Sequence, residues 1–177
     1  MDTIILGLLL LQSRTIYQLR ERIGKGLHLV YSSSMGSIQA AVKKLLCAGY
    51  ISYEECVEKG KYKKIYVITQ KGRQHFAEWV NAPMETQNMK NPELSKLYFM
   101  GYSEKENRSG SIETYLSGLR EQHRLLCMIC EEADGSGVPV EYQDVFHYQL
   151  VAARYGRDLM KFNIEWYEKL LEEMEGK

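Results

Sequence analysis

The chain has 177 residues, of which 45% are hydrophobic and 26% charged, and its 23 Lys and Arg balance 23 Asp and Glu. This composition is typical of a globular protein with one mid-sized core or two small ones, and it excludes an intrinsically disordered chain. The first apolar run, IILGLLLLQ, is too short to span a bilayer and lacks the features of a signal peptide. We therefore expect a cytoplasmic protein with reduced cysteines and no membrane partner.

The neutral total conceals a split between the two halves. Residues 1–80 hold 12 Lys and Arg against 6 Asp and Glu, whereas residues 81–177 hold 11 against 17. A basic half joined to an acidic half is typical of a nucleic-acid-binding region attached to something else. Unequal solvated surfaces that arise by chance are the alternative.

The first half shows three helical patterns. Apolar residues within 4–11 predict a short, buried helix, and those within 15–23 predict a second one. The serine run SSSMGS then offers caps for a third helix, whose apolar residues recur at helical spacing until Gly49 ends it.

A hairpin and a fourth helix follow. YISYEECVE and KKIYVIT are β-rich segments joined by KGKY, which predicts the hairpin tip. Thr69 can cap a helix that ends before Pro83. This element order predicts a winged helix-turn-helix over residues 1–82, in which the third helix enters the major groove of DNA.

Residues 83–93 are polar and predict a linker to a helical domain over 94–177. Ser103 and Glu106 have the spacing of a capping box at the start of a long helix that ends near Ala133. The last helix begins near Glu141. The predicted fold is therefore mainly α with one small β-hairpin.

The last helix carries a heptad-like apolar seam. Its members are Tyr148, Ala152, Tyr155, Leu159, Phe162, Trp166 and Leu170. We expect the same helix of a second subunit to cover this seam, although coverage within one chain is the alternative. Trp166, Tyr155 and Phe162 are also candidates for a pocket that binds a small aromatic effector, although aromatic residues at this spacing more often belong to a core or interface.

The third helix presents the candidate reading surface: Ser37, Gln39, Ala40, Lys43 and Lys44. Glutamine can pair with adenine and alanine can contact a thymine methyl in the major groove. Serines at the helix start, including Ser34, suit a phosphate, and the two lysines are plausible phosphate contacts. An ordinary surface helix with solvated lysines is the alternative.

Four lysines gather at the hairpin tip: Lys59, Lys61, Lys63 and Lys64. Their mutual repulsion needs compensation, which a phosphate backbone supplies. The basic hairpin and the basic third helix together favour binding to double-stranded DNA.

The segment CMIC places Cys127 and Cys130 three residues apart on a predicted helix, with His123 one turn earlier. These side chains are a weak candidate for a zinc or copper site, because structural ligand pairs usually lie in turns and no second pair completes a tetrahedron. Buried cysteine packing is the preferred explanation. We expect no metal, no cofactor and no enzymatic activity, since no nucleophile–base pair is visible.

Three segments resemble the PadR family of bacterial transcriptional regulators: IILGLLLLQSRTIYQLRERI, GSIQAAVKKLLCAGYI and KKIYVITQKGRQHFAEWV. The resemblance spans about residues 3–81. The tail from Glu93, with YGRDLMKFNIEWYEKLLEE, is similar to the longer-tailed branch of the family, in which this region forms a helical dimerisation domain.

The resemblance implies a dimeric regulator, usually a repressor, that binds a palindromic operator and often releases it in response to a small molecule. It implies that Tyr17 is the second-helix tyrosine of the family. It matches the family's third-helix contact surface to Ser37, Gln39, Ala40 and Lys43, and the family's wing to Lys61, Lys63 and Lys64. The chain has Met35 where the family usually has proline, and Ile16 where glycine usually precedes the tyrosine. Gln39 and Ala40 replace a Tyr-Pro pair, so the operator sequence is expected to differ.

Two other hypotheses remain open at this point. A winged helix can serve as a protein-interaction adaptor that does not contact DNA, and it would then dimerise without salt-sensitive DNA affinity. A ligand or metal sensor would instead retain a bound compound or ion on purification.

Overall fold

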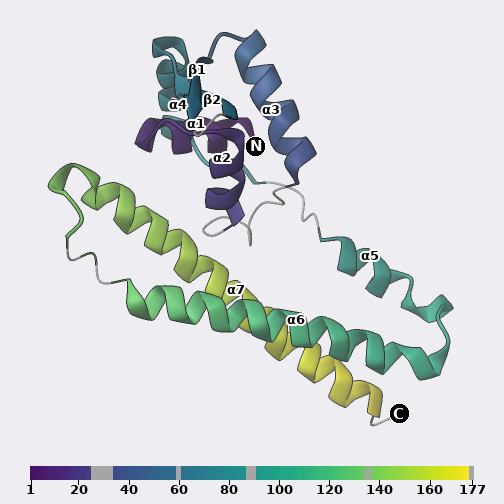
Figure 1. Cartoon of the computed structure of the whole chain (residues 1–177). Coiled ribbons are helices and arrows are strands. Elements are labelled where there is room, and N and C mark those ends of the chain that lie inside the picture. Colours follow the sequence, from purple (N-terminus) through teal and green to yellow (C-terminus); the bar gives the residue numbers. More distant parts are fainter. Residues whose placement is uncertain (25–33, 59–60, 87–90, 134, 136, 176–177) are drawn as a thin grey trace. The chain divides into compact units, whose positions relative to one another are not determined.

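The computed structural model describes residues 1–24, 34–58, 61–86, 91–133, 135 and 137–175, with the backbone alone for Glu58 and Lys61 (Figure 1). The chain divides into two compact units, residues 1–87 and 88–177. It is mainly helical, and its described strands form one two-stranded hairpin. The predicted fold class is therefore confirmed.

The N-terminal unit has the element order that the sequence predicts for a winged helix. Its elements are α1 (Asp2–Leu11), α2 (Ile16–Arg22), α3 (Met35–Cys47), β1 (Ile51–Glu58), β2 (Lys61–Ile68) and α4 (Gln70–Asn81). Thr15 caps α2 in a reciprocal capping box with Gln18, which fixes where this short helix begins. Thr69 caps α4 as predicted, because its side chain accepts a hydrogen bond from the backbone N–H of Gly72.

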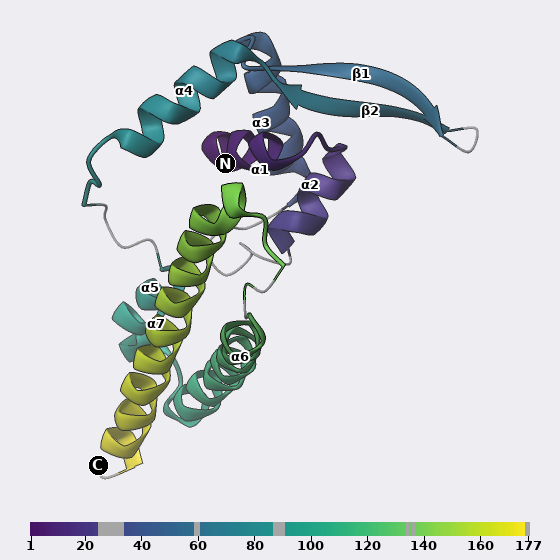
Figure 2. The same ribbon diagram turned by 90° about the vertical axis from the view of Figure 1, so that its left-hand side faces the viewer.

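The two strands are antiparallel and extend away from the helices of their unit (Figure 2). The register pairs Ile51 with Ile68 at the base of the hairpin and Val57 with Tyr62 near its tip. Arg14 exchanges two backbone hydrogen bonds with Tyr66, at 3.1 and 2.8 Å. The segment between α1 and α2 thus ties the hairpin to the helices.

One hydrophobic core holds this unit together. It draws on α1, α2, α3 and the base of the hairpin, and its fully buried members include Ile5, Leu6, Leu19, Ile23, Ile38 and Leu45. Burying a leucine or isoleucine side chain contributes about 1.5–3 kcal/mol. The hairpin tip lies outside this core, so its position depends on its base and on the Arg14 bridge.

The C-terminal unit consists of two long helices preceded by short ones. Its elements are α5 (Pro92–Tyr98), the short 3-10 helices η2 (Met100–Tyr102) and η3 (Val140–Tyr142), and the long helices α6 (Lys105–Glu132) and α7 (Gln143–Glu175). Figures 1 and 2 show α6 and α7 packed along each other, running in opposite directions. Ile112, Leu116, Leu119 and Tyr167 form their buried centre.

The predicted capping box at the start of α6 is wrong. The helix begins at Lys105, one turn of 3-10 helix precedes it, and its N-cap residue Glu104 makes no capping hydrogen bond. The Ser103 hydroxyl instead donates to the Met100 carbonyl at 2.8 Å, and the Arg108 guanidinium donates to the Ser103 carbonyl. Ser103 therefore closes η2, and its side chain is not available to α6.

None of the helices in the described ranges has both the length and the apolar character needed to cross a membrane. α5 begins at Pro92, inside the segment 83–93 that the sequence predicts to be a linker.

Candidate nucleic-acid interface

α3 is amphipathic, and its buried and exposed residues are those that the sequence pattern predicts. Its buried side chains are Ile38, Ala41, Val42 and Leu45, and its exposed ones include Gln39, Ala40, Lys43 and Lys44. The core therefore fixes which face of α3 is accessible. That face presents one amide, one methyl group and two cations along two turns of helix.

Ser34 and Ser37 lie at the start of α3, as predicted, and their hydroxyl groups form hydrogen bonds of its N-terminal cap. The Ser34 side chain accepts from the backbone N–H of Ser37 at 3.2 Å, and the Ser37 hydroxyl donates to the Ser34 carbonyl at 2.9 Å. Both residues remain exposed. They order the first turn of the helix, where backbone N–H groups are open to an anion.

Lys44 has an intramolecular partner that the sequence did not indicate. Its Nζ lies 2.6 Å from a carboxylate oxygen of Asp2, at the start of α1. The pKa of Lys44 is raised first by the hydrogen bond that its ammonium donates to Asp2 and then by the charge of that carboxylate. Lys44 therefore links α3 to α1, and its charge is partly neutralised, whereas Lys43 on the same helix projects from an exposed position.

The C-terminal end of α3 is held from the opposite side by α4. The Thr69 hydroxyl lies 2.8 Å from the Gly49 carbonyl, and the Lys71 ammonium donates to the Ala48 carbonyl at 2.9 Å. Gly49 takes a positive φ of 70°, the left-handed conformation that ends many helices and suits glycine. The predicted glycine stop is thus present, and two side chains of the following helix secure it.

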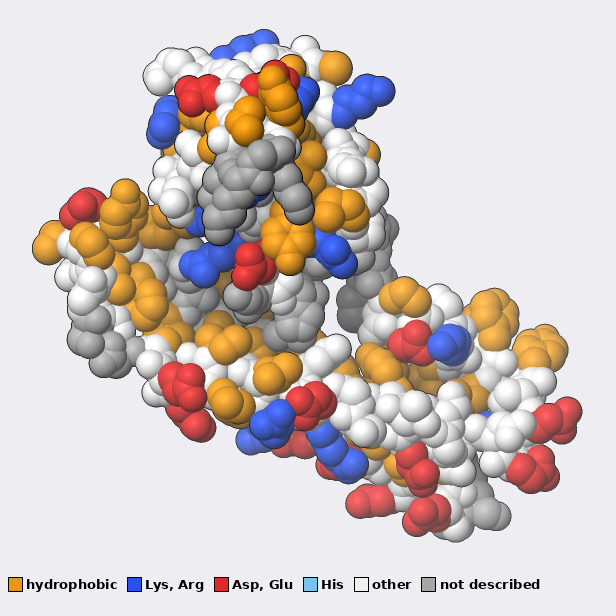
Figure 3. Space-filling view, in the orientation of Figure 1, with side chains coloured by type: hydrophobic (Ala, Val, Ile, Leu, Met, Phe, Trp, Pro, Cys, Tyr) orange, Lys and Arg blue, Asp and Glu red, His pale blue; other side chains and the backbone are white. Residues whose placement is uncertain are grey.

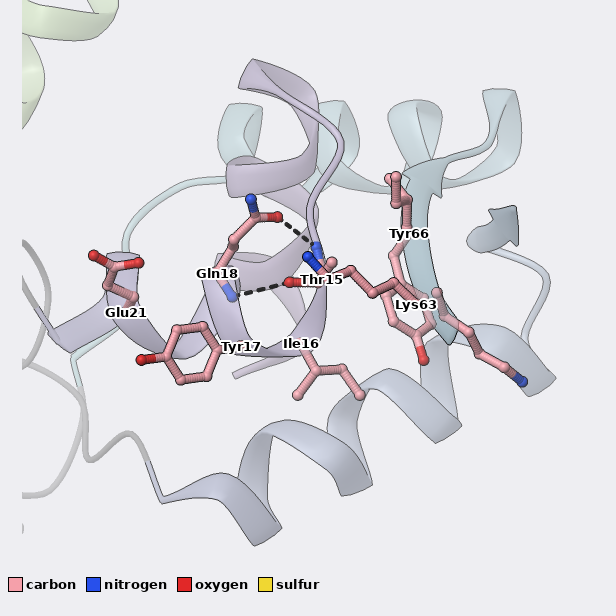
Figure 4. Close-up of a pocket in the computed structure, with 9 residues that line it drawn as sticks. Thr15, Ile16, Tyr17, Gln18, Glu21, Lys63 and Tyr66 are labelled. Carbon is pink, nitrogen blue, oxygen red and sulfur yellow. Dashed lines mark hydrogen bonds between the residues drawn. The ribbon is translucent and has the colours of Figure 1, made fainter. Parts of the chain in front are cut away.

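An open hollow of about 690 Å³ lies between α2 and β2 (Figure 4). Tyr17 and Gln18 line it from α2, and Lys63, Lys64 and Tyr66 line it from β2. Tyr17 is 68% exposed, so its ring is a surface feature and not part of the core. The hollow brings the second-helix tyrosine beside β2, where the neighbouring Lys63 and Lys64 point to opposite faces of the strand.

The four hairpin lysines differ in how far the structure describes them and in what they contact. Lys59 lies outside the described residues, and the side chain of Lys61 is not described. Lys63 and Lys64 are both exposed on β2. Lys64 lies 3.5 Å from Glu55 and 4.0 Å from the ring centre of Tyr53, and its pKa is raised chiefly by the hydrogen bond with Tyr53.

Val57 and Tyr62, a cross-strand pair near the hairpin tip, are surface residues that the sequence reasoning missed. Tyr62 is 80% exposed and Val57 is 62% exposed. They lie on the same face of the hairpin as Ile51 and Ile68, because the register alternates faces at every residue pair. The alternation in YISYEECVE and KKIYVIT was a usable signal, since it continues the buried face beyond the core.

A second surface lies on α7, where the predicted seam is mostly exposed. Tyr148, Ala152, Tyr155, Leu159, Phe162 and Trp166 are all exposed, whereas Leu170 is half-buried against the core of its unit. Figure 3 shows hydrophobic side chains gathered along this helix pair. The face that packs on α6 is a different one, centred on Gly156 and Tyr167.

The three aromatic residues predicted for an effector pocket lie on this exposed face. Tyr155 and Phe162 are 69% and 60% exposed, and the Trp166 ring makes an edge contact with Tyr167 at 4.9 Å. Within one chain they form an open apolar surface. The effector pocket remains a prediction.

His123 and Cys127 are neighbours, as the weak metal hypothesis requires. The Cys127 sulfur lies 3.6 Å from Nε2 of His123, and Cys130 is half-buried one turn further on. Among the residues that the structure describes, however, no three His, Cys, Asp or Glu side chains converge on a point where a metal ion could bind. Among the described residues, His123 and Cys127 thus have no third side chain placed to bind the same metal ion.

Comparison with known proteins gives consistent results. Residues 5–78 match the Transcriptional regulator PadR-like family. The chain is 24% identical over 172 residues to the negative transcriptional regulator PadR of Bacillus subtilis, covering 94% of this chain and 93% of that protein.

Solved structures share the fold along almost the whole chain. Bacillus subtilis PadR in complex with operator DNA superposes with a TM-score of 0.76 at 20% identity, covering 98% of both chains. The same protein in complex with p-coumaric acid gives 0.71 at 20% identity and the same coverage. The Vibrio cholerae virulence activator AphA gives 0.74 at 17% identity, covering 99% of this chain and 98% of that one.

Proposed function

We propose that the chain, whose residues 5–78 match the PadR-like family of transcriptional regulators, is a member of that family, binds operator DNA as a homodimer and acts as a repressor in the cytoplasm. The family is not enzymatic, which agrees with the prediction from the sequence. The proposed parts are a winged helix over residues 1–82, a linker over 83–93 and a helical dimerisation domain over 94–177.

The observation that carries this proposal is the set of exposed side chains on three elements of the N-terminal unit. α3 presents Gln39 and Lys43, and Tyr17 of α2 and Lys63 of β2 line one open hollow. An exposed α3 fits the major groove, and a basic hairpin fits the flanking phosphate backbone. Two copies would read the two halves of a palindrome about one helical turn apart.

Support for the homodimer comes from α7. Six of the seven seam residues are exposed in one chain, and four of them are aromatic. An exposed apolar surface of this kind marks an interaction site, and the same face of a second copy complements it by two-fold symmetry. A small aromatic compound bound between such helices would change the spacing of the two reading helices and so weaken operator binding.

The testing experiment is a titration of labelled duplex DNA with the purified protein, repeated across salt concentrations and followed by fluorescence anisotropy. In the wild-type protein, log Kd should rise steeply with log salt, with a slope of about 0.9 for each phosphate neutralised. The Lys43→Ala and Lys63→Ala changes should each reduce that slope on every DNA sequence. Gln39→Ala should instead alter which sequence is preferred.

Lys161→Ala, an exposed lysine of α7 that pairs with Glu165, is the charge-matched control and should leave the slope unchanged. Equal effects of Lys43→Ala, Lys63→Ala and Lys161→Ala would reject the interface. Addition of p-coumaric acid, the compound bound in one of the Bacillus subtilis PadR structures, tests whether an aromatic acid releases the DNA.

A further inference from the structure

A cluster of chemically active side chains lies on one flank of the α6–α7 pair, in the C-terminal unit and therefore not part of the proposed DNA-binding face of the N-terminal unit. α6 contributes His123, Cys127 and Cys130, and α7 contributes Arg157 and Asp158. With 100° of rotation per residue, Arg157 lies on the opposite side of α7 from Tyr155, Leu159 and Phe162, whereas Asp158 lies about 60° from Tyr155, at the edge of that face. Arg157 is therefore outside the face proposed for the dimer.

The distances within the cluster suit a reactive thiol. The Cys127 sulfur lies 3.6 Å from Nε2 and 3.8 Å from Nδ1 of His123, within hydrogen-bonding reach of sulfur. Cys127, Cys130 and His123 are all half-buried, so their side chains are accessible in part. A histidine at this distance can take the thiol proton, and the resulting thiolate is the nucleophilic form of cysteine.

Arg157 adds a positive charge beside the two sulfurs. Its Nε donates to Asp158 at 2.8 Å. The pKa of Arg157 is raised chiefly by that hydrogen bond and by the charge of Asp158, with smaller contributions from the charges of Cys130 and Cys127. A nearby cation stabilises an anionic sulfur, and Arg157 is fixed on the facing helix by its partner.

We propose that Cys127 is a site of covalent modification by α,β-unsaturated carbonyl compounds such as enals and quinones. His123 takes the proton from the Cys127 thiol, and the thiolate sulfur forms an S–C bond to the β-carbon of the compound. The C=C π bond breaks, its electron pair moves toward the carbonyl oxygen, and the proton held by His123 passes to the α-carbon. Atoms and electrons balance with no further reagent, and His123 returns to its neutral form.

The adduct would enlarge the Cys127 side chain where α6 packs against α7. The adjacent residue, Leu126, is buried and packs against Gly156, where an added Cβ would make ordinary van der Waals contact with the leucine at 3.5 Å. A group much larger than a methyl on Cys127, one residue along α6, would change how the two helices pack. The inference extends beyond DNA binding, and its test uses no DNA, so the two proposals can fail separately.

The experiment measures the rate at which N-ethylmaleimide, an electrophile of this class, labels each of the four cysteines of the full-length protein. Peptide mapping by mass spectrometry resolves the sites, and the exposed Cys47 serves as an internal reference. We expect Cys127 to react faster than Cys47, although Cys47 is more exposed. His123→Gln should slow Cys127 roughly 10²-fold, the low end of what a positioned base contributes, and should leave Cys47 unchanged.

His147→Gln, at an exposed histidine of α7, is the matched control and should change neither rate. Arg157→Gln should slow Cys127 while Arg157→Lys retains its rate, which gives a second test if His123→Gln does not fold. A Cys127 rate at or below that of Cys47 would overturn the proposal. An unchanged Cys127 rate in a folded His123→Gln protein would overturn it as well.

Discussion

Gly72 lies where α4 meets the segment that follows the end of α3, and replacing it with alanine is a severe test of that junction. A Cβ on Gly72 would lie 2.0 Å from the Tyr50 carbonyl oxygen and 2.9 Å from the Ile68 side chain. Carbon and carbonyl oxygen normally approach to about 3.3 Å, so α4 and the start of β1 would have to separate by about 1.3 Å. The hydrogen bonds that the Thr69 hydroxyl makes with the Gly49 and Tyr50 carbonyls, at 2.8 and 3.0 Å, connect the two segments that would have to separate.

We expect Gly72→Ala to lower the free energy of unfolding of the N-terminal unit by about 3 kcal/mol or more, since overpacking and lost hydrogen bonds add. The chain has two tryptophans, with Trp79 in the N-terminal unit and Trp166 in the C-terminal unit. In a Trp166→Phe background, denaturant unfolding followed by Trp79 fluorescence reports on the N-terminal unit alone. A loss below about 1 kcal/mol, within the ordinary range for a single substitution, would refute the steric argument.

Gly110→Ala is the matched control for this change. Gly110 lies inside α6, and no neighbouring atom of the described residues comes within 4 Å of the position an alanine Cβ would take, so alanine should stabilise the C-terminal unit by about 0.5–1 kcal/mol through helix propensity. The same denaturation assay, with Trp166 as the reporter in a Trp79→Phe background, measures it. Destabilisation at both glycines would mean that alanine acts through something other than the space around it.

Three further predictions concern the dimer, the C-terminal core and the α1–α3 link. Phe162→Glu should convert the proposed dimer to monomer in sedimentation velocity, whereas Lys161→Glu beside it should not; equal behaviour would exclude the α7 face. The pKa of Tyr167 is raised first by burial and then by the charges of Tyr115 and Glu93, so its contribution to stability is complete below about pH 10 and is lost as pH rises through the folded pKa. The Tyr167 hydroxyl has no hydrogen-bond partner among the described residues, so Tyr167→Phe should leave the free energy of unfolding at neutral pH unchanged or raised and should reduce its loss at alkaline pH. Leu116→Ala, in the same core, should lower the free energy of unfolding by about 2–5 kcal/mol. Asp2→Asn should release Lys44 and strengthen DNA binding at low salt by a severalfold factor, and weaker binding would mean that the Asp2–Lys44 link positions α3.

The N-terminal fold could be predicted from sequence because each boundary has a local chemical signal. Ser34, Thr69 and Gly49 mark helix ends by capping and by a positive φ, and those interactions involve residues near one another in the chain. The change of apolar period from about four to two marked the hairpin. Each of these features depends on neighbours that the sequence itself displays.

Contacts between distant segments could not be predicted in the same way. Nothing near Lys44 in the chain indicates Asp2, 42 positions earlier, as its partner. Ser103 and Glu106 have the spacing of a capping box, but the competing turn at Met100 takes the serine hydroxyl. On α7 the heptad spacing identified the apolar face, yet it could not separate Leu170, which leans on the unit's own core, from the exposed residues.

The way α3 is secured has a consequence for how the proposed interface would evolve and act. Its buried face and its C-terminal end are fixed by the core and by Thr69 and Lys71, whereas Gln39 and Ala40 lie on the exposed face. These two of the four positions that depart from the resembled family pattern can therefore change without disturbing the helix. A helix that is already ordered loses little conformational entropy on binding, so its exposed side chains decide which DNA sequence is preferred. Substitution at Gln39 should accordingly change sequence preference while the unfolding free energy of the N-terminal unit stays within about 0.5 kcal/mol of wild type.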